Sequence, residues 1–223
     1  MSRSLIAAAI VAIAALLSGC SGEQSHDVAP PMEADDLFPS TTLSDWVTYA
    51  TQISVVHVTS ERRLRGSAGA ETEAPDYIGR SVHIVVDRNL WLAHGTAPRT
   101  EFDLVVAGWK SQDGHEIKTA VLDSPRIEPG DVLVIPLSED PHGAVTLLSP
   151  HAIVPIQAEP VDAHGQLDAA IEALTGKSYD QMSVLLAATP IDPAAVPFED
   201  LAPYERYRKV SEARSATTIS PTR

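Results

Sequence analysis

The chain of 223 residues contains a single cysteine, Cys20, and only 5% aromatic residues. One cysteine excludes an internal disulfide. Its place near the N-terminus also excludes a thiol nucleophile or a cysteine-ligated zinc ion in the rest of the chain. Since hydrophobic residues nevertheless make up 44%, we expect a core of mainly aliphatic side chains, stabilised by packing and hydrogen bonding.

Positive charge is also scarce. The chain has 16 Lys and Arg against 30 Asp and Glu, a net charge of −14. This excess of acid repels phosphate backbones and anionic lipids, so we expect no nucleic-acid partner and no electrostatic attachment to a membrane. The exception is segment 201–223, which we interpret as a solvated helix and tail, with docking on an acidic surface as the alternative. Its five bases are Arg206, Arg208, Lys209, Arg214 and Arg223.

Residues 1–20, MSRSLIAAAIVAIAALLSGC, place one base, Arg3, before an unbroken apolar run from Leu5 to Leu17. This order is typical of a secretory signal. Thirteen helical residues span about 20 Å, which is less than the ~30 Å hydrocarbon core of a bilayer. The run therefore predicts an export signal and not a permanent transmembrane anchor.

The end of this run, Leu17-Ser18-Gly19-Cys20, resembles the bacterial lipobox. The resemblance implies that residues 1–19 are a lipoprotein signal peptide and that a signal peptidase recognises Leu17, Ser18 and Gly19. It also implies a covalent diacylglycerol, with acyl chains such as palmitate, on the Cys20 thiol. Because each buried methylene contributes about 0.8 kcal/mol, two or three acyl chains hold a protein firmly. The expected location is the extracytoplasmic face of the cell membrane.

The segments that follow differ sharply in composition. Residues 20–42 hold five acids, three prolines and no base, which predicts an extended tether. Residues 43–158 contain about six to seven short apolar or alternating runs with turn signals between them, as in Val82, Ile84 and Val86. This pattern predicts a small antiparallel β-barrel or sandwich. Pro136 and Pro155 fall inside these runs, so we expect them at edges or bulges.

Residues 159–214 change to a helical period and predict a cap of two to three short helices, which makes the fold β-rich of the α+β class. Leu167, Ala170, Ile171 and Leu174 share one helix face. Ser178 and Gln181 match a capping box that opens the next helix. Near residue 43, Ser44 or Asp45 is the expected cap of a short helix. Residues 215–223 are expected to be a disordered tail.

His57, His83, Asp87 and Trp109 are the candidate ligand-binding residues. Both histidines lie on the polar face of a predicted strand, so pairing of the two strands places the rings on one face, with Asp87 as a third ligand of a metal site. The alternative is two ordinary, half-exposed imidazoles. Trp109 follows Gly108 near a strand end, and of the three tryptophans it is the one we expect to line a groove.

A serine hydrolase is the enzymatic alternative. The sequence contains neither Gly-x-Ser-x-Gly nor Ser-x-x-Lys. A Ser-His-Asp set drawn from distant positions leaves no trace in sequence order, so this alternative stays open, although we expect no catalytic residues.

The domain resembles uncharacterised exported lipoproteins of actinobacteria in Ser44-Asp45-Trp46-Val47, Asn89-Leu90-Trp91 and the turn Pro129-Gly130-Asp131. An excess of Arg over Lys also indicates a GC-rich bacterial genome. Over residues 43–157 the strand succession is similar to barrels of the oligonucleotide/oligosaccharide-binding (OB) type. Domains of this type often serve as interaction modules, but the resemblance implies no particular activity. The anchor, the acidic tether and the absence of catalytic motifs predict a non-enzymatic envelope module that contacts another envelope protein or a cell-wall glycan. Its only cofactor would be the lipid on Cys20, and a small-ligand or divalent-metal binder is the alternative.

Overall fold

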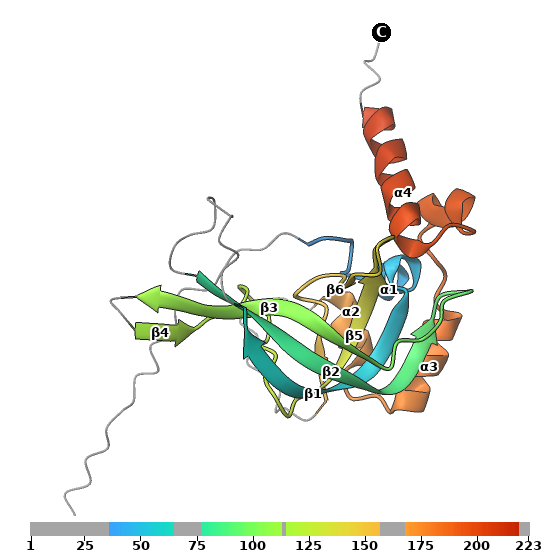
Figure 1. Cartoon of the computed structure of the whole chain (residues 1–223). Coiled ribbons are helices and arrows are strands. Elements are labelled where there is room, and N and C mark those ends of the chain that lie inside the picture. Colours follow the sequence, from blue (N-terminus) through green and yellow to red (C-terminus); the bar gives the residue numbers. More distant parts are fainter. Residues whose placement is uncertain (1–35, 65–76, 113–114, 157–167, 219–223) are drawn as a thin grey trace, which may run out of the picture.

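The computed structural model describes residues 36–64, 77–112, 115–156 and 168–218 (Figure 1). A helix, α1 (Leu43–Tyr49), precedes all the strands, and further helices follow them. The strands are β1 (Gln52–Arg63), β2 (Tyr77–Leu92), β3 (Glu101–Gln112), β4 (His115–Lys118), β5 (Val132–Glu139), β6 (Val145–Leu147) and β7 (Val154–Pro155). The later helices are α2 (Ala169–Leu174), α3 (Tyr179–Ala188), the 3₁₀ helix η1 (Pro193–Phe198) and α4 (Pro203–Thr218).

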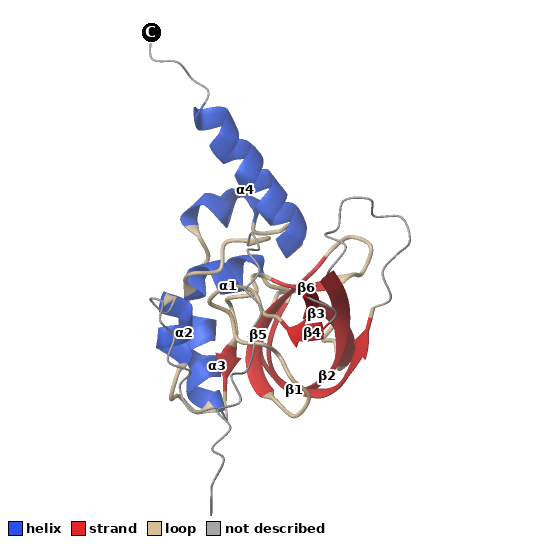
Figure 2. Cartoon of the chain, turned by 90° about the vertical axis from the view of Figure 1, so that its left-hand side faces the viewer, coloured by secondary structure: helices blue, strands red, loops and turns tan. Residues whose placement is uncertain are grey.

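The strands form one antiparallel sheet in the order β4-β3-β2-β1-β5-β6, with β7 paired to β5. Figure 2 shows the sheet curled into a half-barrel, with the helices at one side and end of it. The predicted β-rich fold with C-terminal helices is therefore confirmed.

The hydrophobic core consists of two buried clusters, one inside the curl of the sheet and one on the side of the helices, and β1 contributes to both. Ile53 and Val55 pack in the helix-side cluster, whereas Val56 and Val58 pack inside the curl. Ordinary alternation accounts for this division, because Ile53 and Val55 lie on one face of β1 and Val56 and Val58 on the other, and both faces are covered. The other members inside the curl are Val82, Ile84, Phe102, Leu104, Ile127, Leu133, Ile135, Leu137 and Ile153.

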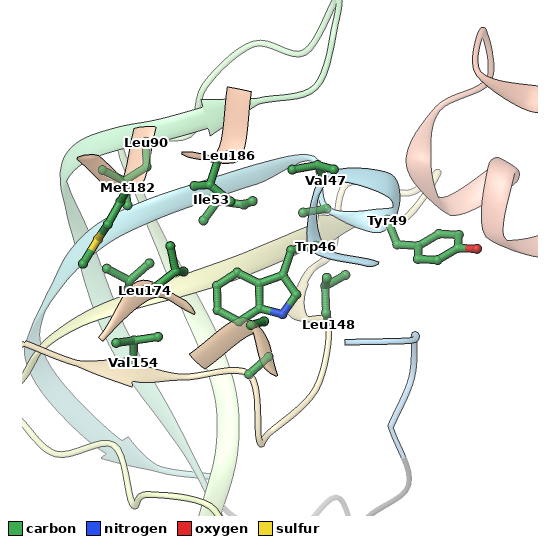
Figure 3. Close-up of a cluster of buried hydrophobic side chains, with 14 of the residues drawn as sticks. Trp46, Val47, Tyr49, Ile53, Leu90, Leu148, Val154, Leu174, Met182 and Leu186 are labelled. Carbon is green, nitrogen blue, oxygen red and sulfur yellow. The ribbon is translucent and has the colours of Figure 1, made fainter. Parts of the chain in front are cut away.

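The helix-side cluster surrounds Trp46 of α1. Figure 3 shows Leu148, Leu174, Val154 and Leu186, from four different segments, in the cluster around it. The indole Nε1 donates to the Ser40 carbonyl (2.7 Å), so the only polar atom of this fully buried ring is satisfied. Phe38, in the segment assigned to the tether, is also buried, and its N–H donates to the Leu148 carbonyl (3.1 Å).

Two helices begin with capping boxes. At α3 the box is Ser178 with Gln181, as predicted. At α1 the cap is Thr42, with Asp45 reaching back to the Thr42 N–H (2.9 Å). The expectation of Ser44 or Asp45 as cap was wrong, because Asp45 is the third residue of the helix and completes the box there.

Pro136 does not lie at a sheet edge, since β5 pairs with β1 on one side and with β6 and β7 on the other. The Pro136 carbonyl accepts from Leu148 N–H, just past the end of β6. The two main-chain groups of one strand residue face the same side. The missing N–H of Pro136 therefore faces the gap between β6 and β7, where no ladder partner is needed. Pro155 does lie in an edge strand, β7.

The last helix, α4, extends away from the body of the molecule (Figure 1). It continues to Thr218, four residues beyond the predicted end of the helical cap. Ion pairs three or four residues apart join Arg208 and Lys209 to Glu205 and Glu212 along its exposed face. In the part of the chain that the structure describes, no helix has both the length and the hydropathy needed to cross a bilayer.

Candidate functional site

A cleft of about 710 Å³ lies where the β2–β3 turn, the end of β5 and the junction of η1 with α4 meet. This volume is within the range of small-molecule sites. The residues that line it are Thr51, Ala93, His94, Gly95, Thr96, Ala97, Pro98, Arg99, Glu139, Asp140, Glu199, Asp200, Leu201, Ala202, Pro203 and Arg206.

One wall of the cleft is the turn between β2 and β3, which is held by a buried amide. Gly95 supplies the left-handed backbone of this turn (φ 75°). The side chain of Gln52, a residue only 2% exposed, accepts from Arg99 N–H (2.8 Å) and donates to the Arg99 carbonyl (3.1 Å). The same amide nitrogen donates to Asn89 Oδ1 (2.9 Å). The turn is therefore fixed to β1 by side-chain hydrogen bonds that replace a ladder.

Paired charges join this turn to the end of β5. The Arg99 guanidinium binds both carboxylate oxygens of Glu139, at 3.0 and 2.7 Å. The Asp140 carboxylate accepts from the N–H groups of Ala144 and His142, which lower the pKa of Asp140. These interactions close the β5–β6 turn and occupy both acids.

Arg206, on the first turn of α4, is the buried charge of the cleft, with 8% exposure. Its guanidinium donates to the main-chain carbonyls of Thr48 (2.6 Å), Glu199 (2.8 Å) and Leu201 (3.0 Å). Within the described residues, its Nε–H has no hydrogen-bond partner and no carboxylate forms an ion pair with it. Burial lowers the pKa of Arg206 below its usual value.

His57 and His83 do lie on neighbouring strands. His57 is opposite Val85, and His83 is opposite Ser60. His83 uses Nδ1 to bond Asp103 of β3 (2.9 Å), which lowers the pKa of Asp103. No group of three or more metal-ligating side chains comes together among residues 36–64, 77–112, 115–156 and 168–218. Neither histidine nor Asp87 lines the cleft.

Trp109 is half-buried, and two guanidinium groups lie close to its ring. Arg63 is 4.8 Å and Arg126 is 5.5 Å from the centre of its ring, both within cation–π range. The residue before Trp109 is Gly108, and only glycine fits at this position, because a Cβ would overlap the Ile78 carbonyl oxygen. Trp109 does not line the cleft, so the expectation that it lines a groove is not met at this cleft, whereas Trp46 lies in the core.

Arg126, which lies near the Trp109 ring, belongs to a network of charged side chains. Arg80, 1% exposed, pairs with Glu61 and Glu128. Glu128 also receives Arg126 (2.8 Å) and Lys118 (3.0 Å). Burial alone would raise the pKa of Glu128, but these cations lower it below its usual value. The mutual pairing of these charges indicates that the network joins β1, β2 and the 119–131 segment, and it leaves little charge for a ligand.

A serine, a histidine and an aspartate do come together, at Ser149, His151 and Asp36. Ser149 Oγ donates to Asp36 and lies 3.2 Å from His151 Nδ1, and Asp36 also lies 3.2 Å from that same nitrogen. The other ring nitrogen of His151, Nε2, donates to the Leu122 carbonyl (2.8 Å). A catalytic triad places its serine and its acid on opposite ring nitrogens. This cluster places both on Nδ1, and Ser149 is 1% exposed, so the histidine is not arranged to take a proton from the serine for attack on a substrate.

Several predicted residues lie outside the described part of the chain, among them Leu17, Ser18, Gly19 and Cys20. Sequence reasoning did not find Gln52 or Arg206. The prediction of a solvated helix is wrong for Arg206, because contacts from α1 and from the end of η1 bury it and no local pattern in α4 indicates them.

The comparisons with known proteins add no relative. No family model matches the chain, and neither a curated protein nor a solved structure gives a significant match.

Proposed function

We propose that this chain is a lipid-anchored extracytoplasmic protein whose half-barrel acts as a non-enzymatic binding module of the cell envelope. The observation that carries the proposal is the segment Leu17-Ser18-Gly19-Cys20, in which the only cysteine of the chain ends an apolar export signal. A net charge of −14 opposes adsorption to anionic lipid, so acyl chains would have to provide the attachment.

Two features of the described residues support a binding role. The cleft of about 710 Å³ combines a buried cation with carboxylates and apolar side chains, which is a common composition of a small-ligand site. The Ser149–His151–Asp36 cluster has the wrong geometry for nucleophilic catalysis. A partner in the envelope, a protein or a cell-wall glycan, is consistent with an anchored module of this kind.

The test of anchoring is expression of the whole chain in a bacterium that processes lipoproteins, followed by membrane fractionation and intact mass. We expect the protein in the membrane fraction, beginning at Cys20, with a mass increase that matches acylation. Cys20→Ser is expected in the soluble fraction, and Ser21→Ala is the matched control that retains the cysteine. An unmodified thiol, or a Cys20→Ser protein that still partitions wholly with membranes, would refute the proposal.

The non-enzymatic part has a separate test. Purified protein is expected to turn over no ester, peptide or glycoside in a substrate panel and to remain unlabelled by a fluorophosphonate probe. Turnover with a defined pH profile would instead establish an enzyme.

A further inference from the structure

We propose that the cleft beside α4 binds the carboxylate of a small zwitterion, such as an amino acid or a short peptide, through Arg206. The inference rests on the binding role proposed above and is independent of the lipid anchor. Arg206 is in an unusual state, because it is a buried cation whose three partners are all main-chain carbonyls.

Buried charges in proteins are normally paired with an opposite charge, because carbonyl dipoles repay only part of the cost of desolvation. In the described chain, Arg206 lacks such a counter-ion and its Nε–H lacks an acceptor. Glu199 contributes only a through-space attraction to this guanidinium and no ion pair. A ligand carboxylate held in the cleft beside this guanidinium would supply the missing opposite charge.

The start of α4 favours an anion at the same place. The helix has 16 residues, and its first turn lines the cleft through Pro203 and Arg206. The residue before it, Ala202, has no side-chain oxygen with which to cap the first-turn N–H groups, unlike Thr42 and Ser178 before α1 and α3. The positive end of the helix dipole therefore adds to the charge of Arg206.

Two exposed acids that line the cleft, in contrast, favour a positive charge. Glu199 and Asp200 are exposed, and within the described residues neither carboxylate has a hydrogen-bond or ion-pair partner. Glu139 is neutralised by Arg99. A ligand with only negative charge would meet repulsion from these two acids, whereas an ammonium group on the same small molecule would be attracted by them. The arrangement thus favours a zwitterion.

The test is calorimetry at neutral pH with the whole chain and three probes: the dipeptide alanyl-alanine, its C-terminal amide and its N-acetyl form. We expect the dipeptide to bind and the amide to bind weaker by about tenfold or more, since a charged hydrogen-bonded pair is lost. N-acetylation should also weaken binding, and the double variant Glu199→Gln, Asp200→Asn should remove that difference.

Matched variants connect the effect to the site. Arg206→Gln should reduce dipeptide affinity to that of the amide, and Arg208→Gln, two residues further along α4, should bind as the unmodified chain does. Because Arg206 also holds three carbonyls, its variant must be checked for folding by circular dichroism. If it does not fold, Ala97→Trp, which obstructs the cleft and leaves Arg206 in place, should abolish binding, with Ala187→Trp on α3 as its control.

The proposal is overturned if the dipeptide gives no binding, if its amide binds equally well, or if a folded Arg206→Gln protein binds normally. Equal affinity of the N-acetyl form would overturn the zwitterion and leave a simple carboxylate as the ligand. None of these outcomes bears on acylation of Cys20, which the mass measurement decides on its own.

Discussion

The buried amide of Gln52 holds both main-chain groups of Arg99, its Oε1 accepting from the Arg99 N–H and its Nε2 donating to the Arg99 carbonyl. The Gln52 side chain thus pairs with the main chain of the β2–β3 turn, as the main chain of a neighbouring strand does elsewhere in the sheet. Because this turn is one wall of the cleft, the contact joins the core of the half-barrel to the shape of the candidate site.

Replacing Gln52 by leucine, which has a similar volume, is expected to destabilise the protein. The change removes the partners of both Arg99 groups and one donor to Asn89, so we expect a loss of about 2 kcal/mol in the free energy of unfolding. Urea denaturation measures it. Gln112→Leu, at the exposed end of β3, is the control and should change the free energy by less than about 0.5 kcal/mol. Similar values for both variants would contradict the role of Gln52.

Gly108→Ala is expected to be strongly destabilising and to disturb Trp109. The new Cβ would overlap the Ile78 carbonyl oxygen, which is main chain and has no alternative rotamer. We expect a loss of about 2–3 kcal/mol together with a changed tryptophan emission. Gly79→Ala on β2 is the matched control, since its Cβ would approach Leu64 only to an ordinary 3.5 Å. A Gly108→Ala protein as stable as the Gly79→Ala protein would show that the strands separate freely here.

The stability of the protein should fall as pH rises through the titration of His151. Burial alone lowers the pKa of His151, but the Asp36 carboxylate and the Leu122 carbonyl outweigh it, so the pKa is raised above 6.5. Nε2 donates to Leu122, hence a neutral ring turns its Nδ1 lone pair toward Asp36, and protonation relieves this repulsion. The resulting stabilisation is complete below pH 6.5 and is lost as pH rises through the raised value.

Unfolding free energies of the wild type and His151→Gln between pH 5 and pH 9 measure this contribution. The difference between the two proteins should shrink with rising pH. His142→Gln, in the exposed β5–β6 turn, is the control and should follow the wild type. A difference that stays constant over the range would exclude a protonated His151.

Tyr49 should ionise later than a free tyrosine. Burial, followed by the charge of Asp192, raises its pKa to about 12. The folded protein therefore keeps this proton more tightly than the unfolded chain, whose tyrosines ionise near 10. The associated stability is present below pH 10 and declines as pH rises toward 12. Spectrophotometric titration should show a late component that Tyr49→Phe removes and Tyr179→Phe leaves. Its persistence in Tyr49→Phe would assign it to another residue.

Local patterns predicted the elements well. Alternation at Val82, Ile84 and Val86 identified β2, and Ser178 with Gln181 identified the start of α3, because each signal depends only on neighbours along the chain. Pro136 misled the edge prediction, since its tolerance depends on where β6 ends and β7 begins. Neither strand patterning nor charge counting could find that His83 pairs with Asp103, because register shifts decide which side chains are opposite one another.

The β-rich class, the helical C-terminal part and the expectation of an acylated Cys20 all follow from short, contiguous segments of the chain. Folding in three dimensions is what buries Arg206, brings Gln52 to the β2–β3 turn and joins Ser149, His151 and Asp36 at a single ring nitrogen. These contacts leave no local signal, because the partners come from segments up to 158 residues apart and meet only through the curl and register of the whole sheet.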